Sequence, residues 1–132
     1  MAEALLRHYG ARRFIVASAG IAPAPTIAPL AHVTMRRIGI SLDDHYPKTL
    51  EAVLAPGQVW DYIITTCDAA REACPSFLGD TRRIHWNFRD PAATTGDEEM
   101  RLHAFRLVRD EIKRRVQLFV ALSAHRRAGV GA

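Results

Sequence analysis

A chain of 132 residues with 48% hydrophobic content has the size of one compact domain, which we expect to span residues 1–132. Its net charge of +4 comes without a basic run longer than three residues, so we expect no nucleic acid partner. Charged residues interrupt the first fourteen positions, and Pro23, Pro25 and Pro29 cut the longest apolar stretch, so we expect no signal peptide and no membrane span in a cytoplasmic protein.

Helix, strand and helix are predicted in turn for the first part of the chain. Apolar residues recur on one helical face from Met1 to Tyr9, and Gly10 suits the end of that helix. The apolar, β-branched run Arg13–Ser18 predicts a buried parallel strand. Pro29 then suits the first turn of a second helix that Gly39 ends, with an apolar face made by Leu30, Ala31, Met35 and Ile38.

Two more strands and a long helix are predicted for the remainder. A short helix at Thr49–Leu54 precedes the strongest strand, Val59–Thr66, and Arg83–Trp86 forms a shorter third strand. The final helix follows a loop, and we expect its apolar stripe to pack on the sheet: Leu102, Phe105, Val108, Ile112, Val116 and Phe119. The alternation predicts an α/β fold, an open parallel sheet flanked by helices with ligands at the carboxyl ends of its strands.

The two cysteines, Cys67 and Cys74, are the main chemical feature. Cys67 directly follows the strongest strand. If the segment between them is helical, seven steps separate the two residues by about 10 Å, whereas a disulfide needs Cα atoms within about 7 Å. Bridging them therefore requires the segment to unwind, as in a redox switch. The alternative is a buried strand-end thiol and a packing residue. A metal site is not expected, because the histidines show no ligand-like spacing with the cysteines.

Several landmarks, in order, resemble the thioredoxin-coupled arsenate reductases of the low-molecular-weight tyrosine phosphatase fold. They are Met1–Leu6, Ser18–Gly20, Cys67–Pro75, His85-Trp86, Asp90-Pro91-Ala92 and Phe105–Ile112. Simple phosphatases of this fold usually carry aromatic residues after Asp-Pro, so Ala92-Ala93 favours the reductase branch. The resemblance implies the family's flavodoxin-like strand order.

In this family, the resemblance implies, a P-loop of Cys, five residues and Arg binds arsenate, and its cysteine attacks the arsenic. A second cysteine attacks the first and releases arsenite, and a third attacks the second, which leaves a disulfide for thioredoxin. Cys67 matches the second cysteine and Cys74 the third. Asp90 matches the general acid. Lys48 stands where some relatives bind potassium through a carboxylate, so no cofactor is expected.

The family's first strand and P-loop lie before the position that aligns with Met1. Neither cysteine here is followed by Arg six positions on, so the oxyanion cradle is missing. We expect an N-terminally truncated chain that neither binds arsenate nor hydrolyses phosphate esters, unless the true start lies upstream. Two alternatives stay open: a non-catalytic redox or binding module that keeps the thiol pair, and a relative of the low-molecular-weight tyrosine phosphatases.

Overall fold

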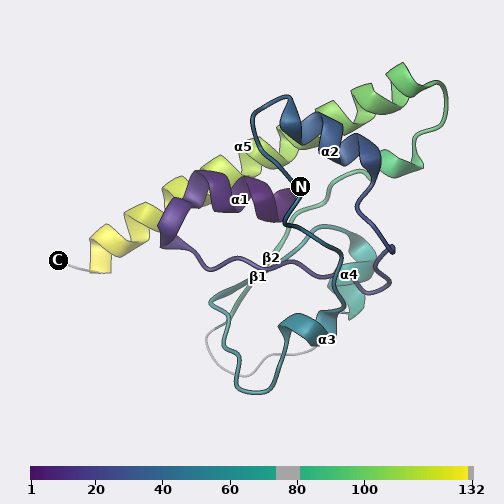
Figure 1. Cartoon of the computed structure of the whole chain (residues 1–132). Coiled ribbons are helices and arrows are strands. Elements are labelled where there is room, and N and C mark those ends of the chain that lie inside the picture. The colour runs from purple at the N-terminus through teal and green to yellow at the C-terminus, as the bar shows by residue number, and fades with distance from the viewer. Residues whose placement is uncertain (74–80, 131–132) are drawn as a thin grey trace. The chain divides into compact units, whose positions relative to one another are not determined.

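The computed structural model describes residues 1–73 and 81–130. They form two compact units (Figure 1). One unit comprises Met1–Ala17, Ile27–Tyr46 and Asp90–Ala132, and the other comprises Ser18–Thr26 and Pro47–Arg89. The first is helical, and the second contains the parallel sheet.

The helical unit is built around one long helix. α5 (Glu98–Val130) contacts both α1 (Ala2–Gly10) and α2 (Pro29–Arg36), and Figure 1 shows α1 running beside it. Two short 3-10 turns, η1 (Ala11–Arg13) and η2 (Pro91–Ala93), complete the unit. These helices confirm the three that the sequence predicts in these regions.

The core of this unit is the predicted apolar stripe of α5. Its buried members are Phe105, Val108, Ile112, Val116 and Phe119. Leu5 of α1 and Met35 of α2 are both 0% exposed, as expected where two helices cover a third. We expected the stripe to pack on the sheet, but within this unit its partners are helices.

The end of α2 is fixed by a glycine, as the sequence predicts. Gly39 has φ of +79°, and its N–H bonds to the oxygen of Arg36 at 2.9 Å. The N–H of Ile40 bonds to the oxygen of Met35 at 3.1 Å, and the Ile40 side chain is buried. This pair of bonds is a Schellman motif, in which a left-handed residue satisfies the last carbonyl groups of a helix.

The second unit holds two parallel strands joined through a helix. β1 (Tyr62–Thr65) pairs with β2 (Arg82–His85), and α4 (Asp68–Ala73) lies between them in sequence. α3 (Leu50–Val53) precedes β1. The parallel sheet flanked by helices confirms the predicted α/β class. β1 is shorter than its predicted run because Val59 is 80% exposed and stays outside the ladder, and β2 begins one residue early.

The predicted strand at Arg13–Ser18 is wrong. Its backbone is extended at Phe14, with φ of −129° and ψ of 140°, but Ile15 is 90% exposed. The Arg7 guanidinium donates to the oxygen of Val16 at 2.7 Å, so a side chain occupies a group that a neighbouring strand would bond. A β-branched run becomes a strand only where another strand pairs with its backbone. Among the described residues, this run has no such ladder.

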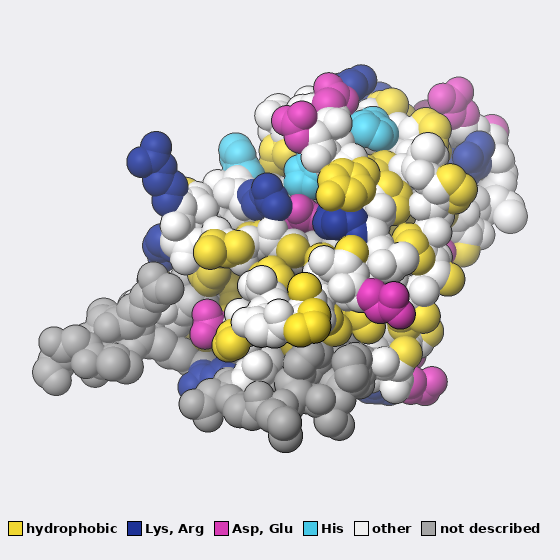
Figure 2. Space-filling model, turned by 60° about the horizontal axis from the view of Figure 1, so that its bottom comes forward, with side chains coloured by type: hydrophobic (Ala, Val, Ile, Leu, Met, Phe, Trp, Pro, Cys, Tyr) yellow, Lys and Arg dark blue, Asp and Glu magenta, His cyan; other side chains and the backbone are white. Residues whose placement is uncertain are grey.

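Charged side chains are scattered over the face drawn in Figure 2. There, Lys and Arg side chains lie singly among acidic, polar and apolar ones, so the net charge of +4 forms no single basic patch on this face. Within the described ranges, no helix is long and apolar enough to cross a bilayer.

Candidate functional site

Cys67 lies just beyond the carboxyl end of β1 and directly before α4. Its sulfur accepts the backbone N–H of Ala70 at 3.4 Å, and its carbonyl oxygen accepts the N–H of Arg71 at 3.1 Å. The cysteine therefore occupies the capping position of α4, a role that usually falls to Ser, Thr, Asp or Asn. The side chain is exposed. The alternative that Cys67 is a buried strand-end thiol is therefore wrong.

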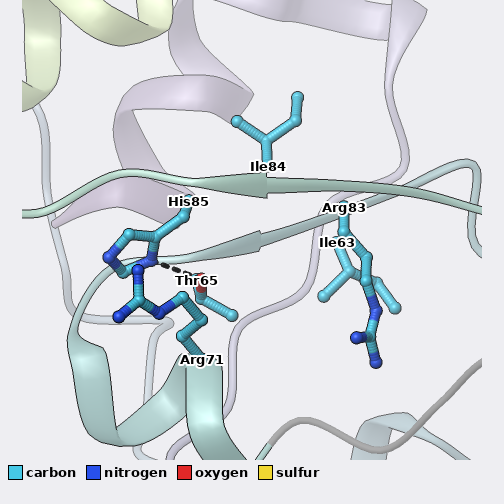
Figure 3. A pocket seen from close by; sticks show the side chains of 6 residues that line it. All are labelled: Ile63, Thr65, Arg71, Arg83, Ile84 and His85. Carbon is cyan, nitrogen blue, oxygen red and sulfur yellow. Dashed lines mark hydrogen bonds between the residues drawn. The ribbon is translucent and has the colours of Figure 1, made fainter.

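His85 lies beside this helix start, at the end of β2. It stands directly opposite Thr65 in the parallel register, so both side chains project from the same face of the sheet. The Thr65 hydroxyl and Nδ1 of His85 are 2.7 Å apart, the bond drawn in Figure 3. Nε2 of His85 lies 3.2 Å from a carboxylate oxygen of Asp68, the first residue of α4.

The tautomer of His85 follows from these two partners. A carboxylate has no proton to give, so Nε2 must donate its N–H to Asp68. In the neutral ring Nδ1 is then an acceptor, and the Thr65 hydroxyl donates to it. The two hydrogen bonds that join Thr65, His85 and Asp68 thus connect β1 and β2 to the first turn of α4.

Arg71 completes the polar group at this end of the sheet. Its guanidinium lies 3.5 Å from the same Asp68 oxygen. The Arg71 and His85 side chains also line a cavity of about 140 Å³ (Figure 3). The other lining residues are Ile63, Thr65, Arg83 and Ile84. A carboxylate with two cationic or donating partners carries a compensated charge beside the exposed Cys67 sulfur.

Of the two predicted redox cysteines, the structure describes Cys67 alone. The sequence predicts that a disulfide between Cys67 and Cys74 requires unwinding if the segment between them is helical. Residues 68–73 are helical. Cys74 itself lies outside the described residues. Three or more metal-binding side chains do not cluster anywhere in the described part of the chain.

Asp90, the predicted general acid, begins the turn η2. Its side chain is exposed, and one carboxylate oxygen accepts the N–H of Ala92 at 2.9 Å, with Pro91 in the first position of the turn. This is the turn-forming role that Asp before Pro ordinarily has. The role as an acid stays a prediction.

Thr65, Asp68, Arg71 and His85 were not predicted as functional residues. Thr65 and His85 each end a strand, which is the signal that could have singled them out. Whether two strand ends are neighbours depends on the pairing of β1 with β2, and the sequence does not contain that pairing.

Comparison with known proteins identifies similar sequences and folds. The family described as low molecular weight phosphotyrosine protein phosphatase matches residues 1–128. An arsenate reductase from Halalkalibacterium halodurans is 36% identical over 119 residues, which cover 90% of this chain and 84% of that protein.

Two solved structures resemble the chain as well. An arsenate reductase in its oxidised state matches with a TM-score of 0.73 at 24% identity, covering 91% of this chain and 85% of that one, which shows a shared fold. A thioredoxin-dependent arsenate reductase from Corynebacterium glutamicum matches with a TM-score of 0.56 at 28% identity, covering 89% of this chain and 54% of that one.

Proposed function

Because the chain belongs to the low molecular weight phosphotyrosine protein phosphatase family, we propose that it serves thioredoxin-coupled reduction of arsenate to arsenite, with Cys67 and Cys74 carrying the electrons. The observation that carries the proposal is the exposed Cys67 sulfur at the carboxyl end of β1, where α/β sheets place their chemistry. The Halalkalibacterium relative and the Corynebacterium structure support the substrate and the reductant. The need for reduced thiols also favours the cytoplasm as its compartment.

The chemistry balances with three sulfur atoms and thioredoxin. A P-loop cysteine displaces an oxygen from arsenate and forms a sulfur–arsenic bond, while Asp90 protonates the leaving oxygen. The Cys67 thiolate then attacks that cysteine, and the electron pair of the broken sulfur–arsenic bond passes to arsenic, which leaves as arsenite. Cys74 attacks Cys67 next and frees the first cysteine as a thiolate. The Cys67–Cys74 disulfide finally takes two electrons from the thioredoxin dithiol.

The packing of α4 suits a segment that must rearrange. The helix has six residues and none of them is buried, so unwinding it uncovers little apolar surface. Isolated helices this short are marginal in water, because nucleation is costly. A disulfide between Cys67 and Cys74 can therefore form at the expense of a few local hydrogen bonds rather than of a core.

The P-loop cysteine is not among the two cysteines of the chain, because neither has Arg six positions later. We propose that the 132-residue chain alone neither reduces arsenate nor cleaves phosphate esters, and that Cys67 and Cys74 take part in arsenate reduction only together with a Cys-x5-Arg loop. Measurable arsenate turnover by the pure chain contradicts this. Translating the DNA that precedes the Met1 codon shows whether such a loop is encoded there.

Counting free thiols directly tests the relay, by which we mean the formation of a Cys67–Cys74 disulfide and its reduction by thioredoxin, since the chain has two cysteines. Mild peroxide should remove both free thiols together in the monomer, and thioredoxin with its reductase and NADPH should restore both. The NADPH consumed should equal one molecule per chain, because a disulfide takes up two electrons. Cys67→Ser and Cys74→Ser are the matched controls and should consume no NADPH through an intramolecular disulfide. Loss of one thiol alone, or a disulfide that thioredoxin leaves intact, contradicts the relay.

A phosphatase is the second candidate, because the matching family is described by that activity. Activity assays on a protein that carries a Cys-x5-Arg loop distinguish a phosphatase from a reductase. A phosphatase should cleave p-nitrophenyl phosphate equally well with Cys74→Ser, whereas a reductase should lose multiple turnover of arsenate with the same substitution. If the loop-bearing protein has neither activity but the thiol pair still cycles with thioredoxin, the chain is a redox module.

A further inference from the structure

Two residues at the start of α4 compete for the same capping role. Asp is among the side chains that cap helices best, and a cysteine is not. Yet the N–H of Ala70 points to the sulfur of Cys67, at 3.4 Å, while Asp68 lies inside the helix as its first residue. Something therefore holds the Asp68 carboxylate away from the free N–H groups of the helix.

Among the residues that the structure describes, two side chains engage that carboxylate, and one of them can anchor it. Arg71 lies 3.5 Å away but belongs to α4 itself, so it moves with the helix. His85 lies 3.2 Å away and belongs to β2. The His85 side chain is 22% exposed, against 61% for Asp68 and 57% for Arg71. The Thr65 hydroxyl on the neighbouring strand fixes the ring from its other nitrogen, at 2.7 Å.

We propose that His85 is a positioning residue for Cys67, acting through Asp68. The inference rests on the proposed function, in which Cys67 attacks a neighbouring sulfur atom. His85 holds the Asp68 carboxylate and so leaves the Ala70 N–H to the sulfur. Figure 3 shows the His85 ring bonded to Thr65. Its Nε2–H also donates a hydrogen bond to a carboxylate one residue from a sulfur that must attack as a thiolate.

Both effects should speed the attack of Cys67 on a disulfide. Without His85, the carboxylate is free to cap the helix one residue later and to repel the attacking thiolate. Interactions between exposed polar side chains are worth up to about 1 kcal/mol, so we expect the attack to slow about two- to fivefold.

The experiment uses the 132-residue chain with Cys74→Ser, so that Cys67 is the one thiol present. The probe is a neutral dipyridyl disulfide. The Cys67 thiolate attacks one of its sulfur atoms, forms a mixed disulfide and releases one coloured thiopyridone. His85→Phe should lower the second-order rate constant about two- to fivefold, and Thr65→Val should lower it less, because the ring keeps its Asp68 partner but loses its orientation. His85→Gln should recover most of the rate, since its amide N–H can replace Nε2 as the donor to Asp68.

Matched controls separate this role from general damage. Thr66→Val, the next residue along the chain, and His103→Phe, an exposed histidine of α5, should leave the rate unchanged. Circular dichroism of each variant should match the parent spectrum, which checks that the overall helix content persists.

A double substitution distinguishes positioning from a structural role. Adding Asp68→Ala to His85→Phe removes the side chain that is otherwise free to cap the helix and to repel the thiolate, so the rate should return to at least the parent value. A ring that merely supports the fold gives no such recovery. Asp68→Ala alone should react at least as fast as the parent, which keeps the test decisive if His85→Phe does not fold.

Equal rates for the parent and for His85→Phe, or no recovery with Asp68→Ala, overturn the inference. Its failure is distinguishable from failure of the proposed function. The thiol-pair experiment with thioredoxin uses the chain with both cysteines, and its outcome does not depend on how fast the dipyridyl probe reacts.

Discussion

The guanidinium of Arg109 donates a hydrogen bond to the main-chain oxygen of Thr34 at 3.0 Å, which joins α5 to the last turn of α2 over a sequence separation of 75 residues. Both residues are buried, with Arg109 at 9% and Thr34 at 0% exposure. A second bond, from Nε to the Asp110 carboxylate at 2.9 Å, offsets the charge of the guanidinium. The predicted apolar face of α2 and stripe of α5 are thus joined by a polar contact as well.

Replacing Arg109 should destabilise the helical unit. Arg109→Met keeps much of the side-chain volume but leaves the Thr34 oxygen without its donor, so we expect the free energy of unfolding to fall by about 1–3 kcal/mol. Urea denaturation followed by circular dichroism measures it. The matched control is Arg114→Met, an exposed position on the same helix, which should change stability by less than about 0.5 kcal/mol. Equal effects at the two positions contradict the role of the bond.

A methyl group at Gly39 should cost stability because of its backbone conformation. Gly39→Ala places a Cβ at φ of +79°, where the added atom meets nothing within 4 Å, so the penalty is conformational and not steric crowding. We expect a loss of about 1 kcal/mol in the free energy of unfolding. Gly20→Ala is the control, since its Cβ meets Pro23 at an ordinary 3.6 Å. An unchanged unfolding midpoint for Gly39→Ala would show that α2 does not depend on the left-handed residue.

Acid should weaken the helical unit partly through Asp43. Hydrogen bonds from Arg36 and Ser41 lower the pKa of the Asp43 carboxyl below its ordinary 3.8, and the Arg36 bond is 2.9 Å long. A depressed carboxyl pKa adds stability that is present above 3.8 and is lost as the pH falls through the lower, folded-state pKa.

Asp43→Asn should therefore flatten the dependence of unfolding free energy on pH below 3.8 and leave it unchanged elsewhere. Urea unfolding midpoints over an acidic series of buffers give the slope. Asp44→Asn, the exposed neighbour, is the control and should keep the slope of the parent. Because the pair is exposed, added salt should also reduce the difference. If both variants have the parent slope, the Arg36–Asp43 pair contributes nothing to acid sensitivity.

The hydrogen bond to the Cys67 sulfur makes its own prediction. Ala70→Pro removes the N–H that the sulfur accepts, and proline is tolerated in the first turn of a helix because the N–H groups there lack carbonyl partners within it. We expect the reaction of Cys67 with the dipyridyl disulfide, in the Cys74→Ser chain, to slow about two- to tenfold, because a typical hydrogen bond is worth about 0.5–1.5 kcal/mol. Ala69→Pro, also in the first turn, should slow it less. Equal rates for both proline variants would assign the effect to the helix and not to the bond.

The outcome at each element shows which features a sequence can predict. The helices at α1, α2 and α5 were predicted correctly, because their apolar periodicity and the glycine that follows α2 act within a few residues. Gly10 is the last residue of α1 and has a right-handed φ of −81°, and it is Ala11 that has a positive φ. Cys67 was placed correctly at the strand end, because β1 carries a dense β-branched and aromatic run. The strand at Arg13–Ser18 failed for the opposite reason, since its apolar residues say nothing about which backbone would pair with them.

The sequence by itself determined where the helices lie, that Cys67 follows a strand, and the family of the chain, because each depends on short stretches of residues whose preferences are local. Only the tertiary structure decided that His85 holds Asp68 and that Arg109 reaches Thr34. Those contacts join residues 17 and 75 positions apart. They follow from strand register and helix packing, which are set by the burial of many side chains at once and cannot be read from any one segment.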